Sequence, residues 1–170
     1  MTIDNYLTLI SILLVLIGGV FALIQWNSTT KLRKAEFIDN IINKIRFDKE
    51  MAETLYTIDY DHFRYNENFQ NKRDLEYKVD KVLSYFDYIC YLYSTKNIGN
   101  TEFKILKYRI SRICSSPSIN EYLWNLYHFS RKSNNECSFM HLINYCIKNK
   151  LIKDEFINNS TDLFNKYLNF

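Results

Sequence analysis

The feature that most constrains this chain is an uncharged apolar stretch near its amino terminus. Residues 6–24 contain no Asp, Glu, Lys or Arg and consist mainly of Leu, Ile and Val. About twenty helical residues at roughly 1.5 Å each cross a hydrocarbon core of about 30 Å. Tyr6 and Trp26 flank the stretch, where amphipathic rings favour the membrane interface. The sequence therefore predicts a transmembrane helix within residues 1–28 and a second domain over residues 29–170.

A cleaved signal peptide is the competing interpretation of this stretch. Signal peptides have a basic leading region, a shorter apolar run and a cleavage site made of small residues. The five residues before Tyr6 instead include Asp4 and no base, and the apolar run is long. We therefore expect the segment to stay in the bilayer.

The charges on either side of the span predict its orientation. Every Lys and Arg lies at or beyond Lys31, with Arg33 and Lys34 close behind it. Basic loops are retained on the cytoplasmic side. We expect a single-pass membrane protein with its amino terminus outside and its carboxy-terminal domain in the cytoplasm. The four cysteines, Cys90, Cys114, Cys137 and Cys146, would then be reduced thiols.

One face of the span is unusually small or polar. At steps of three and four residues it reads Thr8, Ser11, Val15, Gly18, Ala22 and Gln25, and the stripe extends to Thr29. Small residues let helix backbones approach closely in a membrane, whereas contact with lipid gains nothing from them. The stripe predicts self-association of the helix, and lining of a narrow path in a ring of such helices is the alternative.

The remaining residues predict an all-α bundle. The chain is 16% aromatic and has three Gly and one Pro, which excludes a disordered chain and a turn-rich β-sandwich. Apolar residues recur with helical spacing, and no segment alternates as a strand does. We expect an apolar stripe from Phe37 continuing to Leu55, a loop over residues 60–72, and helices over residues 73–96, 101–114, 118–129, 139–152 and 156–168. The expected apolar faces of the first three of these helices are, in turn, Val79, Val82, Leu83, Phe86, Ile89, Cys90 and Tyr93; Phe103, Leu106, Ile110 and Ile113; and Tyr122, Leu123, Leu126, Tyr127 and Phe129. Asn97–Asn100 predicts a Gly C-cap, Thr101 an N-cap, and Ser118 with Glu121 a capping box.

Few residues suggest chemistry. Asp80 and Asp87 lie one heptad apart, but we expect Asp80 on a solvated face and Asp87 bonded to a Tyr or an Arg in a structural role. Cys137, His141 and Cys146 loosely resemble half of a metal site, although packing explains them better. No nucleophile motif, phosphate loop or metalloprotease motif occurs. We expect no catalytic residue, no metal, no cofactor and no small-molecule substrate, so the protein is not expected to be an enzyme.

Basic side chains form the other notable pattern. Lys104, Lys107, Arg109 and Arg112 surround one predicted helix opposite its apolar face, and Arg131 and Lys132 follow another. Such a surface attracts RNA, a nucleotide signal or anionic lipid. A solvated face paired with acids elsewhere is the alternative, because the net charge is only +3.

The layout of the whole chain resembles a class of small bacterial membrane proteins, some of them in antiviral defence. It is most similar to the membrane accessory proteins of the RNA-guided nuclease Cas13b, which also have one span and a helical cytoplasmic domain. That family assembles into a ring-like pore that weakens the host membrane during phage infection. The resemblance implies a homo-oligomeric pore in the bacterial inner membrane and, as partners, a defence nuclease or RNA.

The chain departs from that family at one motif. The family has a degenerate HEPN ribonuclease motif, an Arg followed by a His after four to six residues. Here Arg131 and His141 are the closest such pair, with nine residues between them. RNA cleavage is therefore not expected. Two functions remain: a non-enzymatic membrane effector that forms a pore or perturbs the membrane, and a membrane-anchored helical adaptor or sensor that binds a protein, nucleic acid or nucleotide.

Overall fold

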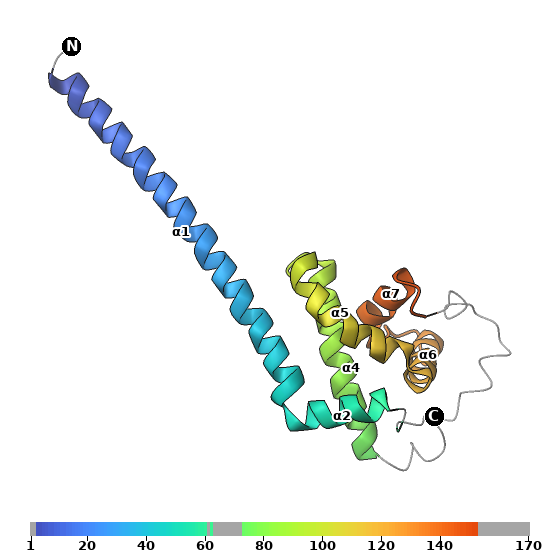
Figure 1. Cartoon of the computed structure of the whole chain (residues 1–170). Helices are drawn as coiled ribbons and strands as arrows, with labels where there is room; N and C mark the ends of the chain where they lie inside the picture. The colour runs from blue at the N-terminus through green and yellow to red at the C-terminus, as the bar shows by residue number, and fades with distance from the viewer. Residues whose placement is uncertain (1–2, 61, 63–72, 153–170) are drawn as a thin grey trace. The chain divides into compact units, whose positions relative to one another are not determined.

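The protein is all-helical over the residues that its structure, a computed structural model, describes (3–60, 62 and 73–152). The helices are α1 (Ile3–Phe47), α2 (Lys49–Asp59), α4 (Arg73–Ser94), α5 (Asn100–Ser115), α6 (Pro117–Lys132) and α7 (Met140–Lys148) (Figure 1). This confirms the expected all-α fold. The helix expected over residues 156–168 and most of the expected loop over residues 60–72 lie outside the described residues.

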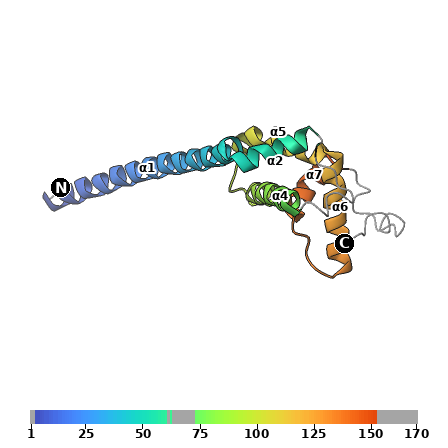
Figure 2. The same cartoon turned by 90° about the horizontal axis from the view of Figure 1, so that it is seen from below.

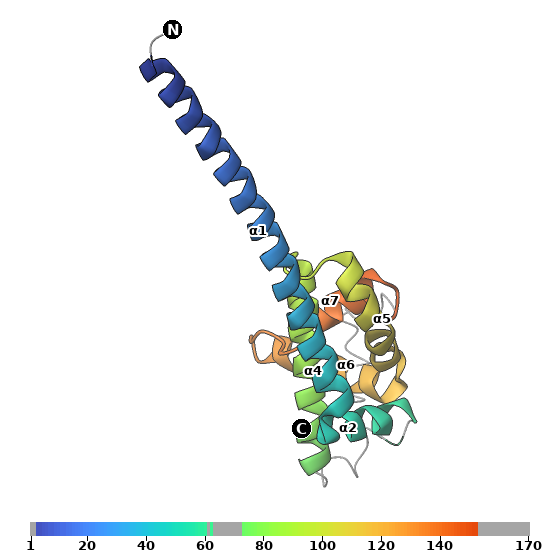
Figure 3. The same ribbon diagram turned by 60° about the vertical axis from the view of Figure 1, so that its left-hand side comes forward.

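The chain divides into two compact units, residues 1–43 and 44–170. The first unit is made of α1, which continues without interruption from Ile3 past Trp26 and Lys31 (Figure 3). This helix is long and apolar enough to cross a membrane, and its apolar window is wholly exposed. The division between the units falls inside α1, and each unit is described by itself.

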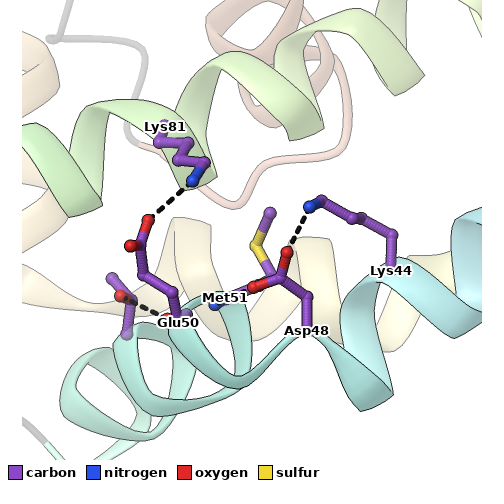
Figure 4. Close-up of polar contacts among 6 residues, drawn as sticks. Lys44, Asp48, Glu50, Met51 and Lys81 are labelled. Carbon is purple, nitrogen blue, oxygen red and sulfur yellow. Dashed lines mark hydrogen bonds and ion pairs between the residues drawn. The ribbon is translucent and has the colours of Figure 1, made fainter.

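A break at Asp48 separates α1 from α2 and was not expected. The Asp48 carboxylate accepts a hydrogen bond from the backbone N–H of Met51 at 3.0 Å, which caps the start of α2. Lys44 pairs with the same carboxylate (Figure 4). The apolar spacing is nearly continuous across this point. Periodicity alone therefore does not predict the break, which depends on Asp48 as the cap of α2.

Helix α4 packs against α2, α5 and α7 in the second unit (Figure 2). As expected, its buried face consists of Val79, Val82, Leu83, Phe86, Ile89 and Cys90. Tyr93, expected in the same set, is half-buried, and its ring stacks on Phe103 of α5 with 3.9 Å between centroids. Each fully buried large apolar side chain contributes roughly 1.5–3 kcal/mol, so this face anchors the bundle.

Three of the predicted helix caps are wrong by a few residues. The turn after α4 places Lys96, not Gly99, in the left-handed region, at φ 62°. Gly99 is instead the N-cap of α5, a position expected for Thr101. The next helix begins at Pro117, and the Ser116 side chain accepts from Ile119 N–H, so Ser118 lies inside α6 rather than before it. Pro117 fits the first helical position because it has no N–H to leave unpaired.

The buried faces of the last three helices largely follow the expected periodicity. Helix α5 buries Phe103, Leu106, Ile110 and Ile113, as predicted. Helix α6 buries more than expected, with Ile119, Trp124, Asn125 and His128 added to Tyr122, Leu123 and Tyr127, whereas Phe129 is 41% exposed. Helix α7 ends at Lys148, four residues before the expected limit. Of these three helices α6 buries the most residues, and the polar side chains of Ser118, Asn125 and His128 are among them.

Candidate functional site

The small-residue stripe of the span lies on one unbroken helix. All six of its residues, Thr8, Ser11, Val15, Gly18, Ala22 and Gln25, are exposed. The Thr8 hydroxyl donates to the Asp4 carbonyl at 2.8 Å, and the Ser11 hydroxyl donates to the Leu7 carbonyl at 2.9 Å. Both hydroxyls are thus satisfied within their own helix. Contact along this stripe would rest on close packing rather than on hydrogen bonds between helices.

The two glycines of the span have no steric role within the chain itself. A Cβ atom built on Gly18 or on Gly19 would meet nothing within 4 Å. Both have ordinary helical backbone, where Gly is less favourable than Ala by about 1 kcal/mol. Nothing in the described part of a single chain therefore accounts for glycine here.

The basic residues of α5 fall into two groups. Arg109 and Arg112 both bind Asp59 at the end of α2, with N–O distances of 2.9 and 3.3 Å to its carboxylate. Arg112 also donates to the Asp59 backbone carbonyl at 3.0 Å. A cation here complements the negative end of the α2 dipole and satisfies a terminal carbonyl. For these two arginines the structure agrees with the alternative of pairing with acids elsewhere, although the sequence did not identify Asp59 as the acid.

The lysines of α5 are placed differently. Lys104 and Lys107 are exposed, and neither has an ion pair in the part of the chain that the structure describes. They flank Ile105 and precede Tyr108, which are 56% and 67% exposed. In the second predicted cluster, the Arg131 guanidinium lies over the Tyr127 ring at 5.9 Å, and Lys132 is exposed at the end of α6. Within α5, the positive charge that has no ion pair among the described residues therefore lies at its lysines rather than at its arginines.

Asp80 is not on a solvated face, so that expectation is wrong. It is half-buried, and its carboxylate accepts a hydrogen bond from the Tyr122 hydroxyl of α6 at 2.5 Å. Burial raises the pKa of Asp80 above its ordinary value, partly offset by that hydrogen bond. The contact links α4 to α6.

Asp87 has the structural role that was expected but a different partner. Its carboxylate accepts from the backbone N–H of Leu142 at 2.8 Å, in the first turn of α7. It therefore caps a neighbouring helix whose own N-cap residue, Phe139, offers no side-chain acceptor. Burial raises the pKa of Asp87, and the hydrogen bond from Leu142 acts in the opposite direction. Nothing in the sequence distinguishes this capping role from a bond to a Tyr or an Arg.

Two of the four cysteines, which were expected to be separate reduced thiols, are bonded to each other in the structure. Cys114 of α5 and Cys146 of α7 form a disulfide, with Cα atoms 6.4 Å apart. Both lie on apolar helix faces that the fold brings together, which spacing alone does not show. Cys90 and Cys137 are free, and burial raises the pKa of Cys90 to about 12, so it is a poor nucleophile.

The structure gives no support to the half metal site that Cys137, His141 and Cys146 loosely resemble. Cys146 cannot act as a thiolate ligand while it is bonded to Cys114. His141 instead packs its ring 5.0 Å from that of Tyr91. No group of three metal-ligating side chains occurs among the residues that the structure describes.

Comparison with known proteins adds no assignment. No family model, no curated protein and no solved structure matches this chain. Any function must therefore be argued from the residues above.

Proposed function

We propose that the protein is a single-span membrane protein that self-associates through its small-residue stripe and acts as a non-enzymatic membrane effector. In this proposal the assembled spans open a pore or perturb the bilayer, in bacterial antiviral defence of the kind linked to RNA-guided nucleases. The observation that carries the proposal is the stripe from Thr8 to Gln25 on one exposed, uninterrupted helix.

The small residues of the stripe support self-association because they have no evident role in a single chain. Apolar side chains fill most other positions of the span, and a plain anchor needs nothing else. Gly18 has open space around its Cα and gives no benefit to its own helix. A neighbouring copy that approaches closely at Gly18 gains van der Waals contact that a larger side chain would prevent.

The side chains that could take part in catalysis support a non-enzymatic role. Asp80 and Asp87, which would be the candidate acid and base, bind groups that hold α4 to α6 and α7. Two cysteines are joined to each other, and Cys90 is buried with a raised pKa. These side chains have structural partners, so the proposal assigns them to stability.

Two observations bear on the orientation and point in opposite directions. Lys31, Arg33 and Lys34 favour a cytoplasmic second unit. The disulfide between Cys114 and Cys146 is typical of an oxidising compartment. We propose the cytoplasmic orientation, with both cysteines reduced in the cell and bonded once the protein is exposed to oxygen. Their Cα atoms, 6.4 Å apart, lie within the range that a disulfide bridges.

An adaptor is the second candidate, and the unpaired lysines of α5 favour it. Lys104 and Lys107 are exposed beside Ile105 and Tyr108, although a solvated helix face has no need of these apolar side chains. In this alternative the span only localises a binding module.

Release of a trapped dye from liposomes tests the effector against the adaptor. The full chain is reconstituted into vesicles that hold a self-quenching dye, beside Gly18→Leu and Gly19→Leu. The proposal expects release with the parent and with Gly19→Leu, and little release with Gly18→Leu. Intact vesicles with all three proteins, at a density that gives assembled parent protein, would contradict the effector and favour the adaptor.

A further inference from the structure

We propose that the second unit binds single-stranded nucleic acid along an aromatic and basic strip that runs from α5 to the end of α2. The strip consists of Lys104, Tyr108 and Arg112 on α5 and of Tyr60 and Tyr56 on α2. This inference does not depend on whether the span self-associates, because every residue of the strip lies in the second unit.

The α5 half of the strip follows from helix geometry. Lys104, Tyr108 and Arg112 are four residues apart in turn, so they lie along one side of the helix. All three are exposed, and Tyr108 is 67% exposed. Lys107 lies beside this line and is also exposed. A basic, an aromatic and a second basic side chain therefore follow one another along about 12 Å of helix.

The contact of Arg112 with Asp59 joins the two halves. Its guanidinium donates to the Asp59 backbone carbonyl at 3.0 Å, at the residue directly before Tyr60. The Tyr60 ring stacks with the Tyr56 ring, with centroids 6.0 Å apart and planes at 11°. These tyrosines are 66% and 57% exposed. Two parallel rings thus lie at the end of α2 that the guanidinium binds.

The charges of the strip suit a phosphate chain. The Asp59 carboxylate lies between two arginines and is only 14% exposed, so it presents little negative surface. Each guanidinium has five N–H donors; within the described residues Asp59 takes one hydrogen bond from Arg109 and two from Arg112. The remaining donors and the unpaired Lys104 and Lys107 are available for phosphate oxygens.

The apolar part of the strip favours nucleobases over a membrane surface. A helix that lies on a bilayer buries an extended apolar face of residues such as Leu, Phe and Trp, whereas the only exposed aliphatic side chain beside Tyr56, Tyr60 and Tyr108 in this strip is Ile105. Bases stack on exposed aromatic rings with little dependence on sequence, and basic groups follow the backbone. This combination identifies single-stranded RNA or DNA as the ligand class.

Fluorescence anisotropy with labelled oligonucleotides tests the proposal. The full chain, in nanodiscs of zwitterionic lipid, is titrated against a twelve-nucleotide RNA and a DNA of the same sequence. We expect saturable binding to one or both, and the difference between them reports a contact to the ribose. Affinity is expected to fall as salt rises, because each phosphate contact releases counterions.

Matched variants distinguish binding along the strip from nonspecific binding. Tyr60→Ala is expected to raise Kd about five-fold or more, whereas Tyr60→Phe, which keeps the ring, is expected to bind like the parent. The control Tyr88→Ala removes an exposed tyrosine of α4 that stacks with Tyr91 and is expected to leave Kd unchanged. Lys104→Glu is expected to weaken binding and reduce the salt dependence, and Lys148→Glu, on exposed α7 surface, to do so much less.

Three results would overturn the proposal. The first is no binding of either strand at low salt. The second is an equal loss of affinity for Tyr60→Ala and Tyr88→Ala in variants whose helical circular dichroism matches the parent. The third is binding of labelled anionic vesicles that depends on Lys104 and Tyr108, with no binding of either oligonucleotide. That result would identify the strip as a membrane-binding surface.

Discussion

The carboxylate of Asp87 accepts a hydrogen bond from the backbone N–H of Leu142 at 2.8 Å, so a side chain of α4 caps the first turn of α7. The two residues are 55 positions apart in the chain. Because Phe139 offers α7 no side-chain acceptor, the cap comes from the helix against which α7 packs. The contact fixes both the start of α7 and its position along α4.

Removal of this cap is expected to destabilise the second unit. Asp87→Ala should lower the free energy of unfolding by about 1–2 kcal/mol, since the N–H of Leu142 loses its acceptor. Asp87→Asn keeps an acceptor oxygen and should lower it less. Urea unfolding followed by tryptophan fluorescence measures both, and Ser84→Ala, at an exposed position of the same helix, is the control. A loss for Ser84→Ala as large as that for Asp87→Ala would contradict the capping role.

The raised pKa of Asp80 predicts a pH dependence of stability. Because its pKa in the folded state lies above 3.8, the folded protein keeps this proton over a range in which the unfolded chain has released it. The contribution of Asp80 to stability therefore falls as pH rises from about 3.8 through the raised value. Asp80→Asn can still accept a hydrogen bond from Tyr122 and removes this fall. Its free energy of unfolding, relative to that of the parent, should therefore be higher at pH 7 than at pH 4.

Asp48 provides the opposite case in the same experiment. The hydrogen bond from Lys44 lowers the pKa of Asp48, and the one from the Met51 backbone acts in the same direction. Its contribution is present above 3.8 and is lost as pH falls through the lowered value. Asp48→Asn should thus be less stable relative to the parent at pH 7 than at pH 3. Shifts of the same sign for Asp48→Asn and Asp80→Asn would contradict these two environments.

The cysteine pair gives a prediction about compartment and stability together. Cells quenched in acid and then alkylated under denaturing conditions should show all four cysteines modified, whereas the purified, air-exposed protein treated in the same way should show only two, Cys90 and Cys137. Reduction should then lower stability by about 3–4 kcal/mol in the chain-entropy description of a 32-residue separation. Two free thiols in intact cells would instead place the second unit in an oxidising compartment and reverse the proposed orientation.

Much of the fold could be predicted because it depends on local periodicity. Apolar residues at three- and four-residue steps predicted the buried faces of α4 and α5, and the uncharged run predicted a helix that is long and apolar enough to cross a membrane. The break at Asp48 and the start of α6 at Pro117 were missed. Each depends on which of several possible capping residues accepts the hydrogen bond at the start of the helix in the folded chain, and the periodicity does not distinguish them.

The site was predicted less well because its key contacts join distant residues. The spacing of Arg109 and Arg112 places them on one side of a helix, but the choice of Asp59, about fifty residues earlier, follows only from the packing of α2 against α5. The same is true of the Cys114–Cys146 bond and of Asp80 with Tyr122. The stripe of the span was readable in full, since it lies within one helix.

The mass of the detergent-solubilised full chain, measured by light scattering after size exclusion, tests the central claim most directly. The parent should form one discrete assembly, and Gly18→Leu and Ser11→Leu should reduce it to a single copy. Gly19→Leu makes the same substitution about 100° around the helix and should keep most of the assembly. A parent protein that is a single copy in several detergents and in nanodiscs, or an assembly that Gly18→Leu leaves intact, would contradict self-association through the stripe.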